Sequence, residues 1–94
     1  MTAVRVEMIR ERLRAALAPL DIEVTDESHL HRGHAGARDG RGHFRVRVIS
    51  RRFAGLNRIE RHRLVYEALG DLMQTDIHAL AVSALTEEET PTGR

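Results

Sequence analysis

The sequence predicts an α+β fold in which a three-stranded mixed sheet carries its helices packed on one face. Apolar residues recur at helical steps in residues 1–20 and again after Asn57, whereas they alternate with polar residues in 21–26 and 44–49. The second helical stretch separates the strand at 44–49 from a third apolar segment, and such a crossover joins parallel strands. The predicted order is α-β-β-α-(α)-β, where the bracketed element is one short extra helical turn.

Residues 1–20 predict an amphipathic helix, and a strand follows it. One apolar stripe follows steps of three and four residues, at Val6, Ile9, Leu13, Leu17 and Leu20. Pro19 lies where the helix should end, because a proline inside a helix removes a hydrogen bond and clashes with the preceding turn. Residues 21–26 then alternate polar and apolar side chains, which predicts a short, half-buried strand.

A glycine-rich connection leads to the second strand. Residues 28–42 contain four glycines and three histidines without periodicity, which predicts a loop that closes a hairpin. In the strand at 44–49 the apolar side chains share one face, and Arg45 and Arg47 share the other. We therefore expect these two arginines to point away from the helices.

The second helix begins at Asn57, a good capping residue whose capping-box partner is Glu60, three residues later. Its apolar stripe starts at Ile59 and runs to about Met73. His62 lies on that stripe, and we expect it to be a buried, hydrogen-bonded histidine.

The third strand and the tail complete the chain. Residues 77–82 form a continuous apolar run interrupted by one histidine, which predicts a buried strand. Three glutamates and a proline then begin a frayed acidic tail. The sequence therefore predicts a single domain at 1–86 and a tail at 87–94.

The composition excludes several classes of protein. With no cysteine, the chain has no disulfide, cysteine nucleophile or thiolate metal site of its own. No apolar run reaches the roughly 20 residues that span a bilayer, and the first residues lack a signal-peptide pattern, so we expect a cytoplasmic protein without membrane contact. Because no nucleophile–base pair, phosphate-binding loop or paired carboxylates stand out, we do not expect an enzyme.

The net charge of +1 hides a basic centre between acidic ends. Residues 29–63 carry ten arginines against two acidic residues, whereas residues 1–28 have a net charge of −2 and residues 64–94 of −5. This asymmetry predicts either an electropositive contact surface for an anionic partner or arginines that simply solvate the outside of a strand and a helix.

The sequence resembles the BolA family from Val6 to Thr86. The densest match is the stretch 43–73, which contains a Phe-x-Gly turn at 53–55 and an Arg-His-Arg-x-Val pattern at 61–65. An Ile-His-Ala segment follows at 77–79. The resemblance implies a fold similar to the class II KH domain, which agrees with the element order inferred from the residues.

Two departures from the family pattern are visible. The usual proline before the last acidic residues is replaced, so that the sequence there is Thr86-Glu87-Glu88. The loop at 29–42 is also longer and richer in glycine than in many relatives. Positions within this loop are therefore matched to the family pattern only to within a few residues.

The resemblance implies a partner of monothiol glutaredoxins with a CGFS active site. The two proteins would share a [2Fe-2S] cluster, with the glutaredoxin cysteine and a glutathione thiol as ligands on one side. On this chain the Ile-His-Ala motif makes His78 the first ligand. The second ligand comes from the loop before the second strand, where His31 is the best match and His34 the nearest rival.

The residues alone allow other interpretations of these histidines. His78 has the same strand parity as Val82, which also suits a hydrogen-bonded histidine at the margin of the core. His31 and His34 also suit ordinary solvated loop residues. His43, at the start of the second strand, is a structural residue or a third-choice ligand.

A second hypothesis is a DNA-binding transcriptional regulator. The family has been linked to transcription, and the short turn with the long helix resembles a helix-turn-helix. Five arginines would form the phosphate-binding surface: Arg51, Arg52, Arg58, Arg61 and Arg63. The chain has only three aromatic residues, which weighs against binding to single strands by stacking. The same arginines suit recognition of an acidic glutaredoxin or of glutathione.

Overall fold

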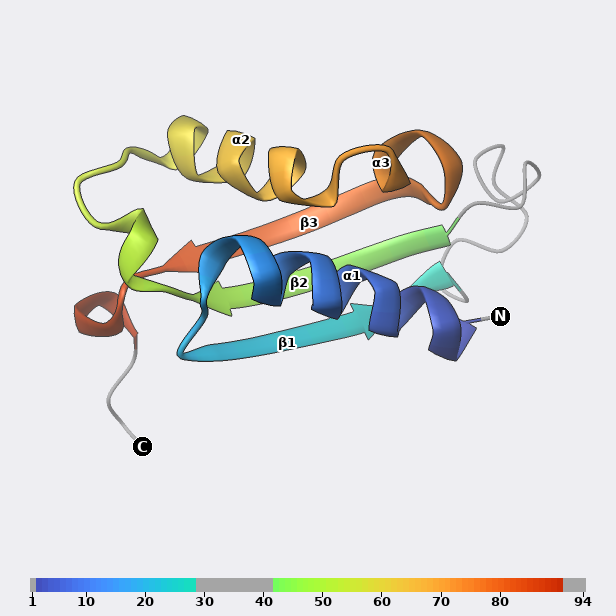
Figure 1. Ribbon diagram of the computed structural model, residues 1–94, viewed down its shortest axis with the longest axis horizontal. Helices are drawn as coiled ribbons and strands as arrows, with labels where there is room; N and C mark the ends of the chain where they lie inside the picture. Colours follow the sequence, from blue (N-terminus) through green and yellow to red (C-terminus); the bar gives the residue numbers. More distant parts are fainter. Residues whose placement is uncertain (1, 29–41, 91–94) are drawn as a thin grey trace.

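A computed structural model describes residues 2–28 and 42–90 and shows the predicted sheet with its helices on one face (Figure 1). The elements in chain order are α1 (Thr2–Leu17), β1 (Asp21–Asp26), β2 (Gly42–Ile49), the 3-10 turn η3 (Arg51–Phe53), α2 (Arg58–Leu69), α3 (Leu72–Thr75), β3 (Ile77–Leu85) and the 3-10 turn η4 (Glu87–Glu89). The α+β prediction is therefore confirmed.

The sheet has the strand order β1-β2-β3, with β2 in the centre. β1 pairs with β2 in an antiparallel register that places Val24 opposite Val46. β3 runs parallel to β2, with Val82 opposite Val46. The predicted hairpin and the predicted helical crossover between parallel strands are both present.

The core lies between the helices and one face of the sheet. Its buried members are Ile9, Leu13, Leu17, Phe44, Val46, Val48, Phe53, Val65, Leu69, Leu72 and Ile77. Leu20, predicted to continue the α1 stripe, is 48% exposed because the helix ends at Leu17. The backbone N–H of Leu20 instead donates to the carbonyl oxygen of Ile49, at 2.7 Å. Within residues 2–28 and 42–90, no helix combines the length and apolar character needed to cross a bilayer.

The long second helix is shorter than predicted. α2 ends at Leu69, and Gly70 adopts a φ of 55°, a left-handed conformation that favours glycine and ends helices. The chain then starts the separate turn α3 at Leu72. Ile59 is 68% exposed, so its predicted place on the stripe is wrong. At 3.6 residues per turn Ile59 lies about 120° around the helix from the buried Val65.

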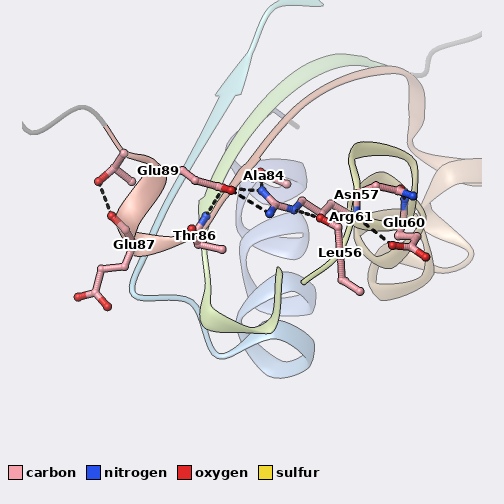
Figure 2. Close-up of polar contacts among 9 residues, drawn as sticks. Leu56, Asn57, Glu60, Arg61, Ala84, Thr86, Glu87 and Glu89 are labelled. Carbon is pink, nitrogen blue, oxygen red and sulfur yellow. Dashed lines mark hydrogen bonds and ion pairs between the residues drawn. The ribbon is translucent and has the colours of Figure 1, made fainter. Parts of the chain in front are cut away.

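The turn η4 is tied to the start of α2 through Arg61 (Figure 2). Its guanidinium donates to both carboxylate oxygens of Glu89, at 2.6 and 3.0 Å, and to the carbonyl oxygens of Leu56 and Ala84, at 2.9 and 3.1 Å. We call this contact set the Arg61 clasp. The sequence predicts a frayed tail that begins at residue 87. In the structure, however, Glu87–Glu89 form a hydrogen-bonded 3-10 turn.

Candidate functional site

Three strand ends meet at one end of the sheet, where β1 finishes and β2 and β3 begin (Figure 1). The sequence predicted a site here from two histidines on different elements. The structure brings together His78 of β3 and His43 of β2, whose ring centroids are 5.2 Å apart and whose planes are tilted by 51°. His31 and His34 lie outside the described residues.

A β-bulge controls the orientation of His78. Gly42 is opposite Ile77, whereas the next residue, His43, is opposite Ala79, so His78 is an extra residue in β3. The bulge places Ile77 in the core and leaves His78 exposed. The alternative interpretation, in which His78 has the parity of Val82 and lies at the margin of the core, does not agree with this exposure.

His43 lies beneath this exposed imidazole. It is 8% exposed, and both of its ring nitrogens are buried. Its backbone is fixed by β1, because its N–H donates to Ser28 Oγ at 3.1 Å and its carbonyl oxygen accepts from the N–H of Glu27 at 2.7 Å. His43 thus provides a rigid wall against which His78 lies.

The end of β1 is held close to β2 by polar contacts. The Arg45 Nε donates to Glu27 Oε2 at 2.9 Å, and this hydrogen bond and the carboxylate charge raise the pKa of Arg45 above its ordinary value. The N–H of Ser28 donates to Asp26 Oδ1 at 2.7 Å, which turns the chain away from the strand. A hollow of about 240 Å³ beside the histidines is lined by Glu27, His43, Phe44, Arg45, Ala79, Leu80 and Ala81.

The described residues at this end do not by themselves make a complete metal site. The described residues contain no group of three or more histidine, cysteine or acidic side chains placed to hold a metal ion. Imidazole nitrogen is nevertheless a suitable ligand for iron. Within residues 2–28 and 42–90, the exposed imidazole of His78 fits a site that receives its remaining ligands from elsewhere.

The five candidate arginines do not form one uniform surface. The side chain of Arg61 is 13% exposed and belongs to the clasp, and Arg51 pairs with Glu87 at 3.3 Å. Within residues 2–28 and 42–90, Arg52, Arg58 and Arg63 have no carboxylate partner, and all three are exposed.

Sequence reasoning gave His43 a minor place and missed the role of Arg61. The position of His43 opposite Ala79 depends on the register of β2 against β3, which a single sequence does not specify once a bulge is present. Arg61 and Glu89 are 28 residues apart, and no local pattern links them.

Comparison with known proteins gives consistent matches over most of the chain. A family model described as BolA-like protein matches residues 13–89. The chain is 39% identical over 90 residues to Protein BOLA1, chloroplastic, of Arabidopsis thaliana, covering 93% of this chain and 56% of that protein. It is 42% identical over 83 residues to the DNA-binding transcriptional regulator BolA of Escherichia coli, covering 88% and 76%.

Solved structures agree with the fold. The BolA domain of SufE1 from Arabidopsis thaliana superposes with a TM-score of 0.81 at 39% identity, covering 92% of this chain and 95% of that one. BolA1 from the same plant gives a TM-score of 0.79 at 34% identity, covering 93% and 96%. The full-length curated relatives are longer: the chain spans 56% of Protein BOLA1 and 23% of SufE-like protein 1.

Proposed function

This chain belongs to the BolA-like family, and on that premise we propose that it is a non-enzymatic partner of a monothiol CGFS glutaredoxin. In this proposal the two proteins together ligate a [2Fe-2S] cluster, for cluster trafficking or for iron and redox regulation in the cytoplasm. The observation that carries the proposal is the bulge that exposes His78 beside the buried His43. A ligand for a cluster brought by another protein has to be accessible and held in place, and His78 meets both conditions.

The chemistry of imidazole suits a cluster that is passed on. A neutral imidazole ligand in place of a thiolate raises the reduction potential of a [2Fe-2S] centre. Imidazole also competes with protons near neutral pH, so a histidine-ligated cluster becomes labile in mild acid. The chain's own contribution is to hold His78 at the surface, while His31 or His34 remains the candidate second ligand.

The experiment that tests the proposal compares two histidine variants. The protein is mixed with a CGFS glutaredoxin, glutathione, ferrous iron and sulfide, and visible absorption and circular dichroism are recorded. We expect a heterodimer spectrum different from that of the glutaredoxin homodimer, and we expect His78→Ala to weaken this difference. His62→Ala, on α2, is the matched control and should leave the spectrum unchanged. A homodimer spectrum with the wild-type protein contradicts the proposal.

A DNA-binding regulator remains the second candidate function. The observation that favours it is that Arg52, Arg58 and Arg63 are exposed without carboxylate partners in the described part of the chain. A relative at 42% identity also carries the name of a DNA-binding transcriptional regulator. Titration of a labelled DNA duplex at several salt concentrations tests it: three phosphate contacts predict a log–log slope of about −3. A slope near zero excludes this role for the three arginines.

A further inference from the structure

β3 is an edge strand of the described sheet, and within residues 2–28 and 42–90 no other strand pairs with its outer side. The N–H of Ser50 donates to the carbonyl oxygen of Leu85, so the backbone of Leu85 faces β2. Because successive residues of a strand point their N–H and C=O groups to opposite sides, the backbone groups of Leu80, Val82 and Ala84 face the open edge. Consistent with this parity, the Ala84 carbonyl oxygen accepts from Arg61 instead of from the sheet.

A groove runs between this edge and α2. It has a volume of about 380 Å³ and is lined by Leu56, Arg58, Arg61, His62, Val82, Ser83, Ala84, Leu85 and Glu89. One wall is therefore the edge of a strand and the other is the first half of a helix. In peptide binding by strand addition, main-chain hydrogen bonds to an exposed sheet edge give affinity, and pockets beside the edge that accept alternate side chains give specificity.

The charge in the groove favours an acidic occupant. The far end already binds one carboxylate, because Glu89 of the same chain is held by Arg61 (Figure 2). Arg58 lines the same groove without a carboxylate partner among the described residues. It is also the first residue of α2, where the positive end of the helix disfavours a cation, so a bound anion would relieve this repulsion.

We propose that the groove between α2 and the open edge of β3 binds an extended acidic segment of a partner protein by strand addition. The segment pairs with the outward backbone groups of Val82, and one of its carboxylates contacts Arg58. A nucleic acid meets the charge requirement but has no backbone that pairs with a strand. A second copy of this chain that paired its β3 edge with this one would bring a second Arg58, so its charge would not complement the first.

This proposal goes beyond the shared cluster. The groove lies where β3 ends, whereas His78 lies where β3 begins. His78 and Val82, the residue that pairs with the segment, are separated by four positions, roughly 13 Å along a strand. Failure of one proposal therefore leaves the other unaffected.

The test uses a fluorescein-labelled dodecapeptide with glutamate at every second position and valine or threonine between. A peptide with lysine in place of glutamate and a 12-base-pair DNA duplex are the comparison probes, and binding is measured by anisotropy. We expect the acidic peptide to bind and the lysine peptide not to bind. Amide resonances of the ¹⁵N-labelled protein should shift at residues 80–84. If the acidic peptide does not bind at about 1 mM, the proposal is overturned.

Two variants separate strand addition from simple charge attraction. Val82→Pro removes an outward N–H but no hydrogen bond to β2, and an edge strand tolerates such a proline. We expect this variant to lose peptide binding while its thermal unfolding stays cooperative. Arg58→Glu should lower the affinity about tenfold. Arg63→Glu is the matched control, since it lies about 140° around α2 from Arg58, and should change the affinity less than twofold. If Val82→Pro folds and binds normally, or if the DNA duplex binds more tightly than the peptide, the proposal is overturned.

Discussion

At the scale of single residues, Gly42 shows how tightly the histidine end is packed. A Cβ atom at this position would lie 2.6 Å from Phe44 Cε2 and 2.8 Å from Ser28 Oγ. Phe44 belongs to the core, and Ser28 Oγ accepts a hydrogen bond from the backbone of His43. A shift of either side chain would therefore disturb these contacts. Glycine is therefore required at position 42 because a larger side chain would clash with its neighbours. The backbone φ of Gly42 does not impose this requirement.

The first prediction follows from this contact. Gly42→Ala should lower the free energy of unfolding by about 1–3 kcal/mol, as overpacking does in other cores. The measurement is urea unfolding followed by circular dichroism. Ser83→Ala, on the exposed side of β3, is the control and should change stability by less than about 0.5 kcal/mol. Equal stability of Gly42→Ala and the wild type would show that the packing at this end is loose.

Arg61 carries the second prediction. Arg61→Ala removes the donors to the carbonyl oxygens of Leu56 and Ala84 and leaves both acceptors without that partner. We expect a loss of roughly 1–2 kcal/mol in the free energy of unfolding. Arg63→Ala, which removes an exposed arginine two residues away, should cost less than about 0.5 kcal/mol. Similar losses for both variants would mean that the Arg61 clasp does not stabilise the fold.

At the scale of elements, the clasp joins η4 to α2 and makes stability depend on pH. The Arg61 guanidinium, together with the N–H of Thr86, lowers the pKa of Glu89 from its ordinary value of 4.5 to about 2. A carboxyl whose pKa is depressed in the folded state stabilises that state above its unfolded pKa. The contribution is lost as the pH falls through the folded value.

The third prediction uses Glu89→Gln to isolate this effect. The wild type should be more stable than the variant at pH 7, and the difference should shrink between about pH 4.5 and pH 2. Urea unfolding of both proteins across this pH range measures the difference in stability. The contributions of the other carboxyl groups cancel in this difference because both proteins contain them. A difference that stays constant down to pH 2 contradicts the clasp. High salt should reduce the difference at neutral pH.

Some elements were predictable from local pattern, and others depended on distant contacts. The alternation in β1 and β2 and the crossover rule suffice to predict the order and direction of the strands. The break at Gly70 was missed because apolar residues continue at helical spacing on both sides of it, at Leu69 and Leu72. Only the positive φ of Gly70 separates the two helices.

The candidate site was predictable only in part for a similar reason. The Ile-His-Ala motif selected His78, but strand alternation does not reveal the bulge beside it, so the exposure of His78 was not predictable from the sequence. The approach of His43 follows from the same bulge. The loop ligands His31 and His34 lie outside the described residues and stay predictions.

At the scale of the whole molecule, β3 connects two chemically different ends. The protein is longest in one direction, 39 Å against 29 and 23 Å, and the strands follow this long axis (Figure 1). The histidines lie where β3 begins, and the arginine-lined groove lies where it ends. A partner bound at one end therefore leaves the other end accessible.

The fourth prediction tests this separation. Sites more than about 10 Å apart with no shared partners behave additively. His78→Ala should therefore leave the affinity for the acidic peptide unchanged, and Arg58→Glu should leave the circular dichroism spectrum of the shared cluster unchanged. The double variant should lose both properties. If Arg58→Glu also changes the cluster spectrum, the two ends act as one binding surface.

Pulsed electron paramagnetic resonance tests the role of His78 most directly. The reduced cluster is assembled from unlabelled glutaredoxin and from this protein labelled with ¹⁵N only at histidine, so any coordinated ¹⁵N comes from this chain. We expect a strong ¹⁵N coupling that weakens in His78→Ala and persists in His62→Ala. A spectrum without coordinated ¹⁵N, or one that His78→Ala leaves unchanged, contradicts ligation by His78.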